Sequence, residues 1–336
     1  MIVVYDELYT EHLRRTDHPE SPDRVSYVAE RLGAAGLMAE RAAARDASDA
    51  ELERVHPHAY LERVKRDVET VGAHAGYLST GDTAIDASSL AVARRAAGGA
   101  LAAMEAAVDV ERATFALVRP PGHHAEPARG MGFCVFGNAA VAARAFVDTF
   151  GGRALVVDFD YHHGNGTQAA ARDGVSFVST HAYPAYPGTG GPLEQRFVRD
   201  SAIVNVPLPP HRYGTEAFVA TWQRLLPAVA ERVRPDFIVV SAGYDFAAGD
   251  PVGDLGVDAP LAARALSSTI AEVAATFARG RVAYCLEGGY DVKTLAAAIE
   301  ATVRANDAGE SADRADAGAI PAAQRAILER VTEWAI

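Results

Sequence analysis

The chain alternates short runs rich in β-branched residues with longer alanine-rich segments, and this alternation limits the fold more than any other feature. The runs ALVVDF, DFIVVSA and RVAYCL are nearly continuous in apolar residues, as expected for strands buried on both faces of a parallel sheet. Strands are expected at residues 2–5, 114–118, 154–159, 175–180, 202–206, 236–241 and 281–286. Helices are expected at residues 26–36, 90–108, 138–150, 215–233, 259–278 and 321–336. This order predicts a doubly wound α/β fold with right-handed crossovers.

The composition is that of a globular protein with a large core. The chain has 336 residues, of which 49% are hydrophobic, and this excludes disordered and fibrous proteins. We expect a single domain over residues 1–336, with the polar tract at residues 307–319 as a surface loop. Its two cysteines, Cys134 and Cys285, lie in apolar stretches, which excludes a secreted disulfide scaffold.

The charge is acidic, with 32 basic and 44 acidic side chains and a net charge of −12. Like charges repel, so we expect no nonspecific binding to nucleic acid or to an anionic membrane. No stretch approaches the ~20 apolar residues that span a bilayer, and the first residues lack the pattern of a signal peptide. These features predict a cytoplasmic protein, and they leave its oligomeric state open.

Polar clusters follow several predicted strands directly. PPGHHAEP follows TFALV, DYHHGNGTQ follows ALVVDF, AGYDFAAGD follows DFIVV, and EGGYD follows RVAYCL. Ligands bind at the carboxyl ends of strands in open parallel sheets, so these clusters are expected to meet in one crevice.

The cluster that follows ALVVDF has the residue types of a metal site. Asp158, Asp160 and His162 are two residues apart, so an extended strand end directs them to one side. Two carboxylates and an imidazole there would be costly to bury without a cation. Asp245 supplies a further ligand, and Asp160, His162 and Asp245 form the open set of a catalytic zinc. The same set also accepts Fe(II), Co(II) or Mn(II), and an ion-pair network without metal is the alternative.

The tandem histidines suggest proton transfer. His123 and His124 follow Pro-Pro-Gly on a loop, and one neutral ring can take a proton from the attacking water while one charged ring protonates a leaving amine. Asp158 is expected to orient His123, and Asn165 to orient His124. Tyr290, after two glycines, can stabilise an oxyanion. For each histidine the alternative is a structural role, and for GGY it is a simple turn.

Two aromatic residues lie next to these loops. Phe133 is in GMGFC and Tyr186 is in YPAYPGTG. Core packing and contact with a substrate explain them equally well.

These motifs resemble those of a known family. RPPGHHAEPARGMGFCVFGNAAVAA, VVDFDYHHGNGTQ, SAGYDFAAGDPVG and CLEGGYD are similar to segments of the zinc-dependent histone deacetylase and acetylpolyamine amidohydrolase family, and HPESPDR is similar to its N-terminal motif. The resemblance runs from residue 18 to about residue 300, in the family's order. HHGNGTQ and EGGY resemble the class II and bacterial branch.

The resemblance implies the three-layer arginase–deacetylase α/β fold, with a central eight-stranded, mainly parallel sheet flanked by helices. It implies that Asp160, His162 and Asp245 bind zinc, that His124 is the general base, and that Tyr290 polarises the carbonyl. Further positions match a substrate tunnel walled by Phe133 and Tyr186, contacts to the substrate at Gly132 and Gly288, a rim residue at Asp82 and an exit channel at Arg24. A structural potassium ion is implied behind Asp158, Asp160 and His162, with Ser179 and Thr180 contributing.

The expected activity is therefore removal of acetyl or another short acyl group from a primary amine such as acetyl-lysine or an acetylpolyamine, with release of acetate. The short segment 67–82 lacks an obvious acidic pair, which counts against a dedicated polyamine enzyme. Two alternatives are an arginase-like ureohydrolase, which needs two manganese ions and more carboxylates, and a catalytically weak binder of acyl-lysine.

Overall fold

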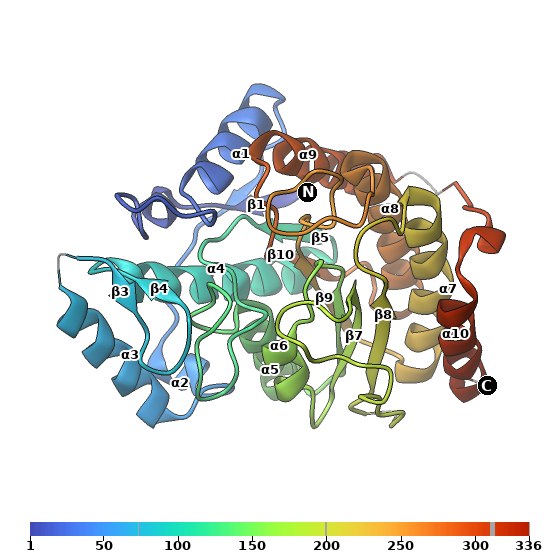
Figure 1. Ribbon diagram of the computed structural model, residues 1–336, viewed down its shortest axis with the longest axis horizontal. Coiled ribbons are helices and arrows are strands. Elements are labelled where there is room, and N and C mark those ends of the chain that lie inside the picture. Colours follow the sequence, from blue (N-terminus) through green and yellow to red (C-terminus); the bar gives the residue numbers. More distant parts are fainter. Residues whose placement is uncertain (73, 199, 310–312, 336) are drawn as a thin grey trace.

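The computed structural model describes residues 1–72, 74–198, 200–309 and 313–335, and an eight-stranded sheet forms its framework (Figure 1). The strand order is β2-β1-β5-β10-β9-β6-β7-β8, and every pairing in this sheet is parallel. The strands are β1 (Ile2–Val4), β2 (Arg41–Ala42), β5 (Ala113–Ala116), β6 (Ala154–Asp158), β7 (Val175–Ala182), β8 (Ile203–Leu208), β9 (Phe237–Ala242) and β10 (Val282–Leu286). The eight-stranded parallel sheet implied by the resemblance is thus confirmed.

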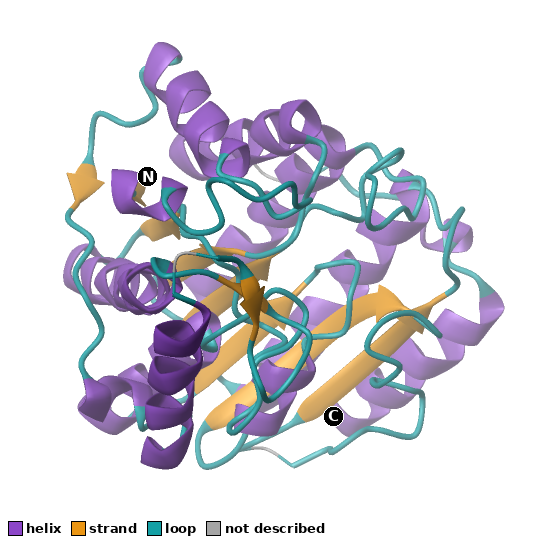
Figure 2. Cartoon of the chain, turned by 60° about the vertical axis from the view of Figure 1, so that its left-hand side comes forward, coloured by secondary structure: helices purple, strands orange, loops and turns teal. Residues whose placement is uncertain are grey.

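Helices lie on both sides of the sheet (Figure 2). One layer is a continuous series along the upper and right-hand side of Figure 1, formed by α1 (Asp23–Ala34), α9 (Val292–Ala308), α8 (Ala259–Phe277), α7 (Thr215–Val233) and α10 (Ala322–Ala335). The other layer is built on α4 (Ser89–Val110) and α5 (Asn138–Phe150), with α2 (Asp49–Leu52), α3 (His58–Val71) and α6 (Asn165–Ala170) beside them. The remaining elements are the hairpin β3 (Gly76–Tyr77) and β4 (Ala84–Ile85), and the short helices η1 (Glu7–Thr10) and η2 (Ala317–Ala319).

The structure contains elements that the sequence did not predict. They are the two-residue edge strand β2, the helices α2, α3, α6 and α9, the hairpin of β3 and β4, and the short helices η1 and η2. Residues 313–316 of the expected polar loop have no regular structure, whereas residues 310–312 lie outside the described part. No helix of the described ranges combines the length and apolarity needed to cross a bilayer.

The order of the strands brings the predicted polar clusters together. All residues of β6, β9 and β10 are buried, which explains their continuous apolar sequence. The clusters follow β5, β10, β9 and β6, and these strands are direct neighbours in the sheet. Because the strands are parallel, their carboxyl ends meet at one edge.

Candidate active site

A group of three potential metal ligands lies at this edge of the sheet. One ligand atom each from Asp160, His162 and Asp245 falls within 4.8 Å of the others, and all three residues are buried. His162 Nδ1 is 2.9 Å from Asp245 Oδ2 and 3.3 Å from Asp160 Oδ1. The structure therefore assembles the set that the sequence analysis selected. Asp158, in contrast, turns toward His123, with His123 Nδ1 3.2 Å from its Oδ2.

Local backbone contacts hold the two ligand carboxylates. The His162 N–H donates to Asp160 Oδ1 at 2.8 Å, and the Tyr161 N–H donates to Asp245 Oδ1 at 2.8 Å. The Gly288 N–H donates to Asp160 Oδ2 at 2.8 Å. A Cβ at Gly288 would lie 2.5 Å from Asp245 Oδ2, so only glycine permits this approach.

The charges of the group explain why it suits a cation. Burial and the neighbouring Asp160 raise the pKa of Asp245 to about 7. Burial opposes the charge of Asp160 as well, but the rings of His123 and His162 hold the pKa of that carboxyl below its usual value. The carboxylates of Asp160 and Asp245 lie close to the His162 imidazole. Together they offer two oxygens and one nitrogen, a donor set that fits zinc and other divalent transition metals.

The tandem histidines differ in protonation. His124 Nδ1 is 2.9 Å from Asn165 Oδ1, and the Asn165 amide donates to Glu126 Oε1 at 2.8 Å. This second bond fixes the amide orientation, so His124 Nδ1 is the donor and its Nε2 can accept a proton. Burial, His123 and His162 lower the pKa of His124 well below its usual value.

His123 has the opposite character. Burial acts to lower its pKa, but the carboxylates of Asp160 and Asp158 outweigh burial and hold this pKa well above its usual value. Its imidazolium can therefore donate a proton, whereas the neutral His124 ring can accept one. The two rings lie side by side, with centroids 4.1 Å apart.

Arg24 contacts the ring of Tyr290 and the backbone that precedes it. The buried Arg24 guanidinium lies 4.8 Å from the centroid of the Tyr290 ring. Arg24 Nε donates to the Gly289 carbonyl at 2.7 Å, and another guanidinium nitrogen donates to the Glu287 carbonyl. Burial raises the pKa of Tyr290 well above its usual value, so its hydroxyl keeps its proton as a hydrogen-bond donor.

A cavity of about 360 Å³ joins these groups. The residues around it come from three of the polar clusters, from the loop after β9 and from the rim: Asp82, His124, Gly132, Phe133, His162, Tyr186, Val252 and Tyr290. Phe133 and Tyr186 therefore line a cavity as well as packing against neighbours. At the mouth, Asp82 accepts hydrogen bonds from the Gly132 N–H at 2.9 Å and from the Tyr186 hydroxyl at 3.0 Å.

Other expected residues lie outside this lining. Gly288 contacts the metal group through its N–H rather than facing the cavity. Ser179 Oγ is 2.9 Å from His181 Nδ1, and within the described residues Thr180 Oγ1 is buried without a hydrogen-bond partner.

Some residues of the site were missed by the sequence analysis. Val252 forms part of the cavity wall, and the His18 ring lies edge-on to Phe133 with centroids 4.7 Å apart. The buried Glu287 carboxylate accepts the His123 N–H at 3.0 Å and so holds the tandem histidines from behind. These three residues lie in motifs that can be recognised in the sequence: GDPVG, HPESPDR and EGGYD. Their contacts, however, are known only from the structure.

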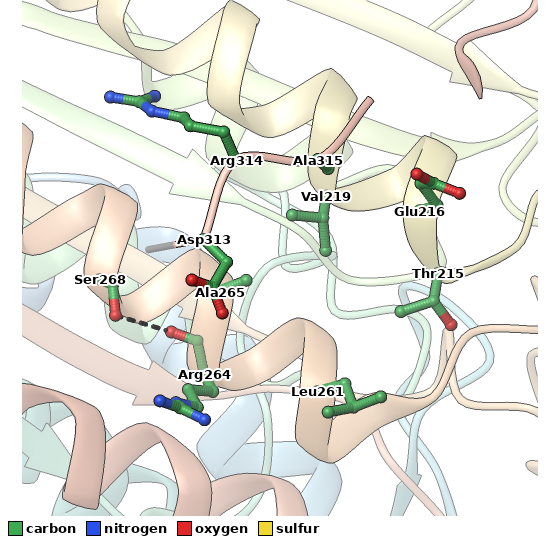
Figure 3. Close-up of a pocket in the computed structure, with 10 residues that line it drawn as sticks. All are labelled: Thr215, Glu216, Val219, Leu261, Arg264, Ala265, Ser268, Asp313, Arg314 and Ala315. Carbon is green, nitrogen blue, oxygen red and sulfur yellow. Dashed lines mark hydrogen bonds between the residues drawn. The ribbon is translucent and has the colours of Figure 1, made fainter. Parts of the chain in front are cut away.

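A second hollow of about 300 Å³ lies between α7 and α8, and residues 313–315 form part of its wall (Figure 3). Its lining includes apolar side chains such as Val219 and Leu261 and charged ones such as Glu216 and Asp313. It contains no member of the Asp160, His162 and Asp245 group. The chemistry described above therefore belongs to the cavity at the sheet edge.

Comparisons with known proteins point to one family. The histone deacetylase domain family matches residues 18–306. A probable deacetylase of Archaeoglobus fulgidus is 35% identical over 296 residues, which cover 87% of this chain and 81% of that protein. A histone deacetylase-like amidohydrolase of Pseudomonas aeruginosa is 38% identical over 281 residues, covering 81% of this chain and 72% of the relative. The crystal structure of the HDA15 HD domain superimposes with a TM-score of 0.86 at 29% identity, covering 99% of this chain and 94% of that one.

Proposed function

The chain belongs to the histone deacetylase family of hydrolases, and we propose that it is a zinc-dependent amidohydrolase that removes acetyl or short acyl groups from primary amines. The observation that carries this proposal is a single cavity lined by His124, His162 and Tyr290. A base, a metal ligand and a hydroxyl donor thus face the same space, which is what amide hydrolysis requires.

Each residue of the site has a separate role in the proposed reaction. A divalent cation held by Asp160, His162 and Asp245 would polarise the acyl carbonyl and the attacking water. The neutral His124 accepts the proton of that water, and the Tyr290 hydroxyl donates a hydrogen bond to the carbonyl oxygen as negative charge develops there. The charged His123, oriented by Asp158, protonates the leaving amine.

The proposal extends to the substrate and to a second cation. Phe133 and Tyr186 wall a cavity that suits the extended methylene chain of acetyl-lysine or of an acetylated diamine. A structural potassium ion is proposed behind Asp158, Asp160 and His162. The unpartnered Thr180 Oγ1 within the described residues supports that site, to which Ser179 would also contribute.

The direct test is acetate release from an acetyl-lysine peptide and from acetylated diamines. We expect release by the metal-loaded protein, loss with a chelator and recovery on adding zinc. Asp245→Asn, which removes a ligand charge, should not recover. Absence of release from any acylated amine, with bound metal confirmed by elemental analysis, would contradict the proposal. Urea release from a guanidino substrate with two metal ions per chain would instead favour the ureohydrolase.

A further inference from the structure

Asp250 joins two loops of the site through one buried carboxylate. It follows β9 by eight residues and is 8% exposed. Its Oδ1 accepts the N–H groups of Val252 at 2.9 Å and Gly253 at 3.2 Å. Its Oδ2 accepts the N–H groups of Tyr290 at 2.6 Å and Asp291 at 3.1 Å, across 40 residues of sequence.

The four backbone donors around the carboxylate explain why residue 250 is an aspartate. Each carboxylate oxygen meets two backbone donors, and no ion pair to Asp250 occurs among the described residues. An asparagine of the same shape would turn its NH₂ group toward one pair of N–H donors, because its amide accepts at one end only. The negative charge is thus compensated by backbone dipoles alone, in charge-assisted hydrogen bonds.

The two loops carry different parts of the site. Residues 243–257 hold the metal ligand Asp245 and the cavity wall at Val252, and residues 287–291 hold Tyr290. Gly289 has φ of +118°, a conformation open mainly to glycine, so the backbone before Tyr290 has little steric restraint of its own. Within the described residues, no hydrogen bond holds the Tyr290 hydroxyl. Its direction therefore depends on its backbone and on ring contacts with Phe133 and Arg24.

We propose that Asp250 is a positioning residue, whose carboxylate fixes the backbone of Tyr290 relative to the metal-ligand loop and so directs the Tyr290 hydroxyl into the cavity. The inference rests on the proposed role of Tyr290 in hydrolysis. A displacement of about 1 Å in a reacting group can lower a rate by on the order of 100-fold, so a residue that never contacts the substrate can control turnover.

The first test compares Asp250→Asn with Asp254→Asn. Asp254 lies in the same loop and also accepts two backbone N–H groups, from Gly249 and Gly256, but in the described part of the chain it makes no bond to the Tyr290 loop. We expect Asp250→Asn to lower kcat by about 10- to 100-fold with KM changed by less than about threefold, and Asp254→Asn to leave both nearly unchanged. Equal behaviour of the two variants would overturn the inference.

A double-mutant cycle separates positioning from general damage. Tyr290→Phe should lower kcat by about 100- to 1,000-fold, the size expected for loss of an oxyanion donor. In that background Asp250→Asn should have little further effect, because no hydroxyl remains to be directed. A full multiplicative loss would overturn the inference. Metal content, measured for every variant, should stay at the wild-type level.

A third measurement does not depend on activity. Amide hydrogen exchange in the metal-loaded protein should be faster at Tyr290 and Asp291 in Asp250→Asn, and unchanged there in Asp254→Asn. Unchanged exchange in Asp250→Asn overturns the inference, whereas a wild type inactive on every acylated amine contradicts the proposed function alone. If Asp250→Asn does not fold, Asp250→Glu replaces it. It keeps both acceptor oxygens one methylene further out, and its kcat should fall below that of the wild type with KM nearly unchanged.

Discussion

Asp82 is an exposed carboxylate at the mouth of the cavity that already has donors of its own. The Gly132 N–H and the Tyr186 hydroxyl hold it in place, so it offers its remaining lone pairs to a substrate in a fixed direction. Preorganisation of this kind lowers the entropy lost on binding. We therefore expect the rim to contribute to binding and not to bond cleavage.

Replacing this carboxylate should affect binding alone. We expect Asp82→Ala to raise KM several-fold for acetyl-lysine peptides and acetylated diamines, with kcat within about twofold, because the lost contact is distant from the reacting atoms. Steady-state kinetics on both substrates measure this. Tyr186→Phe keeps the aromatic wall and removes only the hydroxyl that holds Asp82, so it should raise KM less than Asp82→Ala does. Loss of turnover in Asp82→Ala, or an unchanged KM for every substrate, would show that the rim assignment is wrong.

At the scale of elements, the buried strands were predictable, whereas the very short elements and the helix α3 were missed. The strands β6, β9 and β10 are buried throughout and carry continuous apolar runs that mark them in the sequence. β2 has two residues, Arg41 and Ala42, which carry no such pattern and pair only because β1 lies beside them. α3 buries just Tyr60, Leu61, Val64 and Val68 among charged residues. Local sequence does not specify β2, because tertiary contacts decide it, whereas the apolar residues of α3 have helical spacing that the sequence analysis did not use.

The site shows the same division. The groups that carry chemistry follow strands directly, so the strand order alone brings Asp160, His162 and Asp245 to one edge. The contact between Asp250 and Tyr290 spans 40 residues and depends on backbone N–H groups, which leave no signature in side-chain identity. Contacts of this kind require the structure.

His56 links the connection between α2 and α3 to the start of α5. Its Nδ1 is 3.1 Å from the Pro127 carbonyl, and its Nε2 accepts the N–H of Gly137, the residue before α5, at 2.9 Å. Nδ1 therefore carries the proton, and a second proton on Nε2 would face the Gly137 donor. Burial lowers the pKa of His56 from 6.5 to about 4.

The free energy of unfolding should therefore decrease as the pH falls. Above pH 6.5 the ring is neutral in both states, but between pH 6.5 and 4 the unfolded state binds a proton that the folded state does not. We expect His56 to reduce the free energy of unfolding by about 2 kcal/mol between pH 7.5 and pH 5.

Urea denaturation of wild type and His56→Gln at both pH values measures this contribution. The glutamine can accept from Gly137 and donate to Pro127 while staying neutral, and subtraction of the two proteins removes the contributions of other buried histidines such as His12 and His163. An identical pH dependence in the two proteins would rule out this role for His56.

At the scale of the whole molecule, stability should depend on the cation at the sheet edge. Asp158, Asp160, Asp245 and Glu287 are almost completely buried, and their mutual repulsion is unfavourable without positive charge. We expect zinc added to chelator-treated protein to raise the melting temperature, by an amount that corresponds to about 2.7 kcal/mol at a hundredfold excess over Kd. Asp245→Asn should lose most of this rise. An equal rise in both proteins would place the metal outside the proposed group.

The overall charge of −12 should act on substrates before they reach the rim. At physiological salt the Debye length is about 8 Å, so this field attracts cationic carriers over a short range and fades as salt is added. For acetylated diamines and lysine-rich acetyl peptides we therefore expect KM to rise several-fold between about 20 mM and about 500 mM salt, with kcat unchanged, because attraction concerns the encounter and not bond cleavage.

An uncharged acetyl-lysine peptide is the control, and its KM should stay nearly constant. Asp82→Ala should keep most of the salt dependence, since it removes one of 44 acidic side chains. If the neutral peptide shows the same salt response, the effect lies in the protein and not in attraction of the carrier, and the charge of the molecule has no part in selecting its substrates.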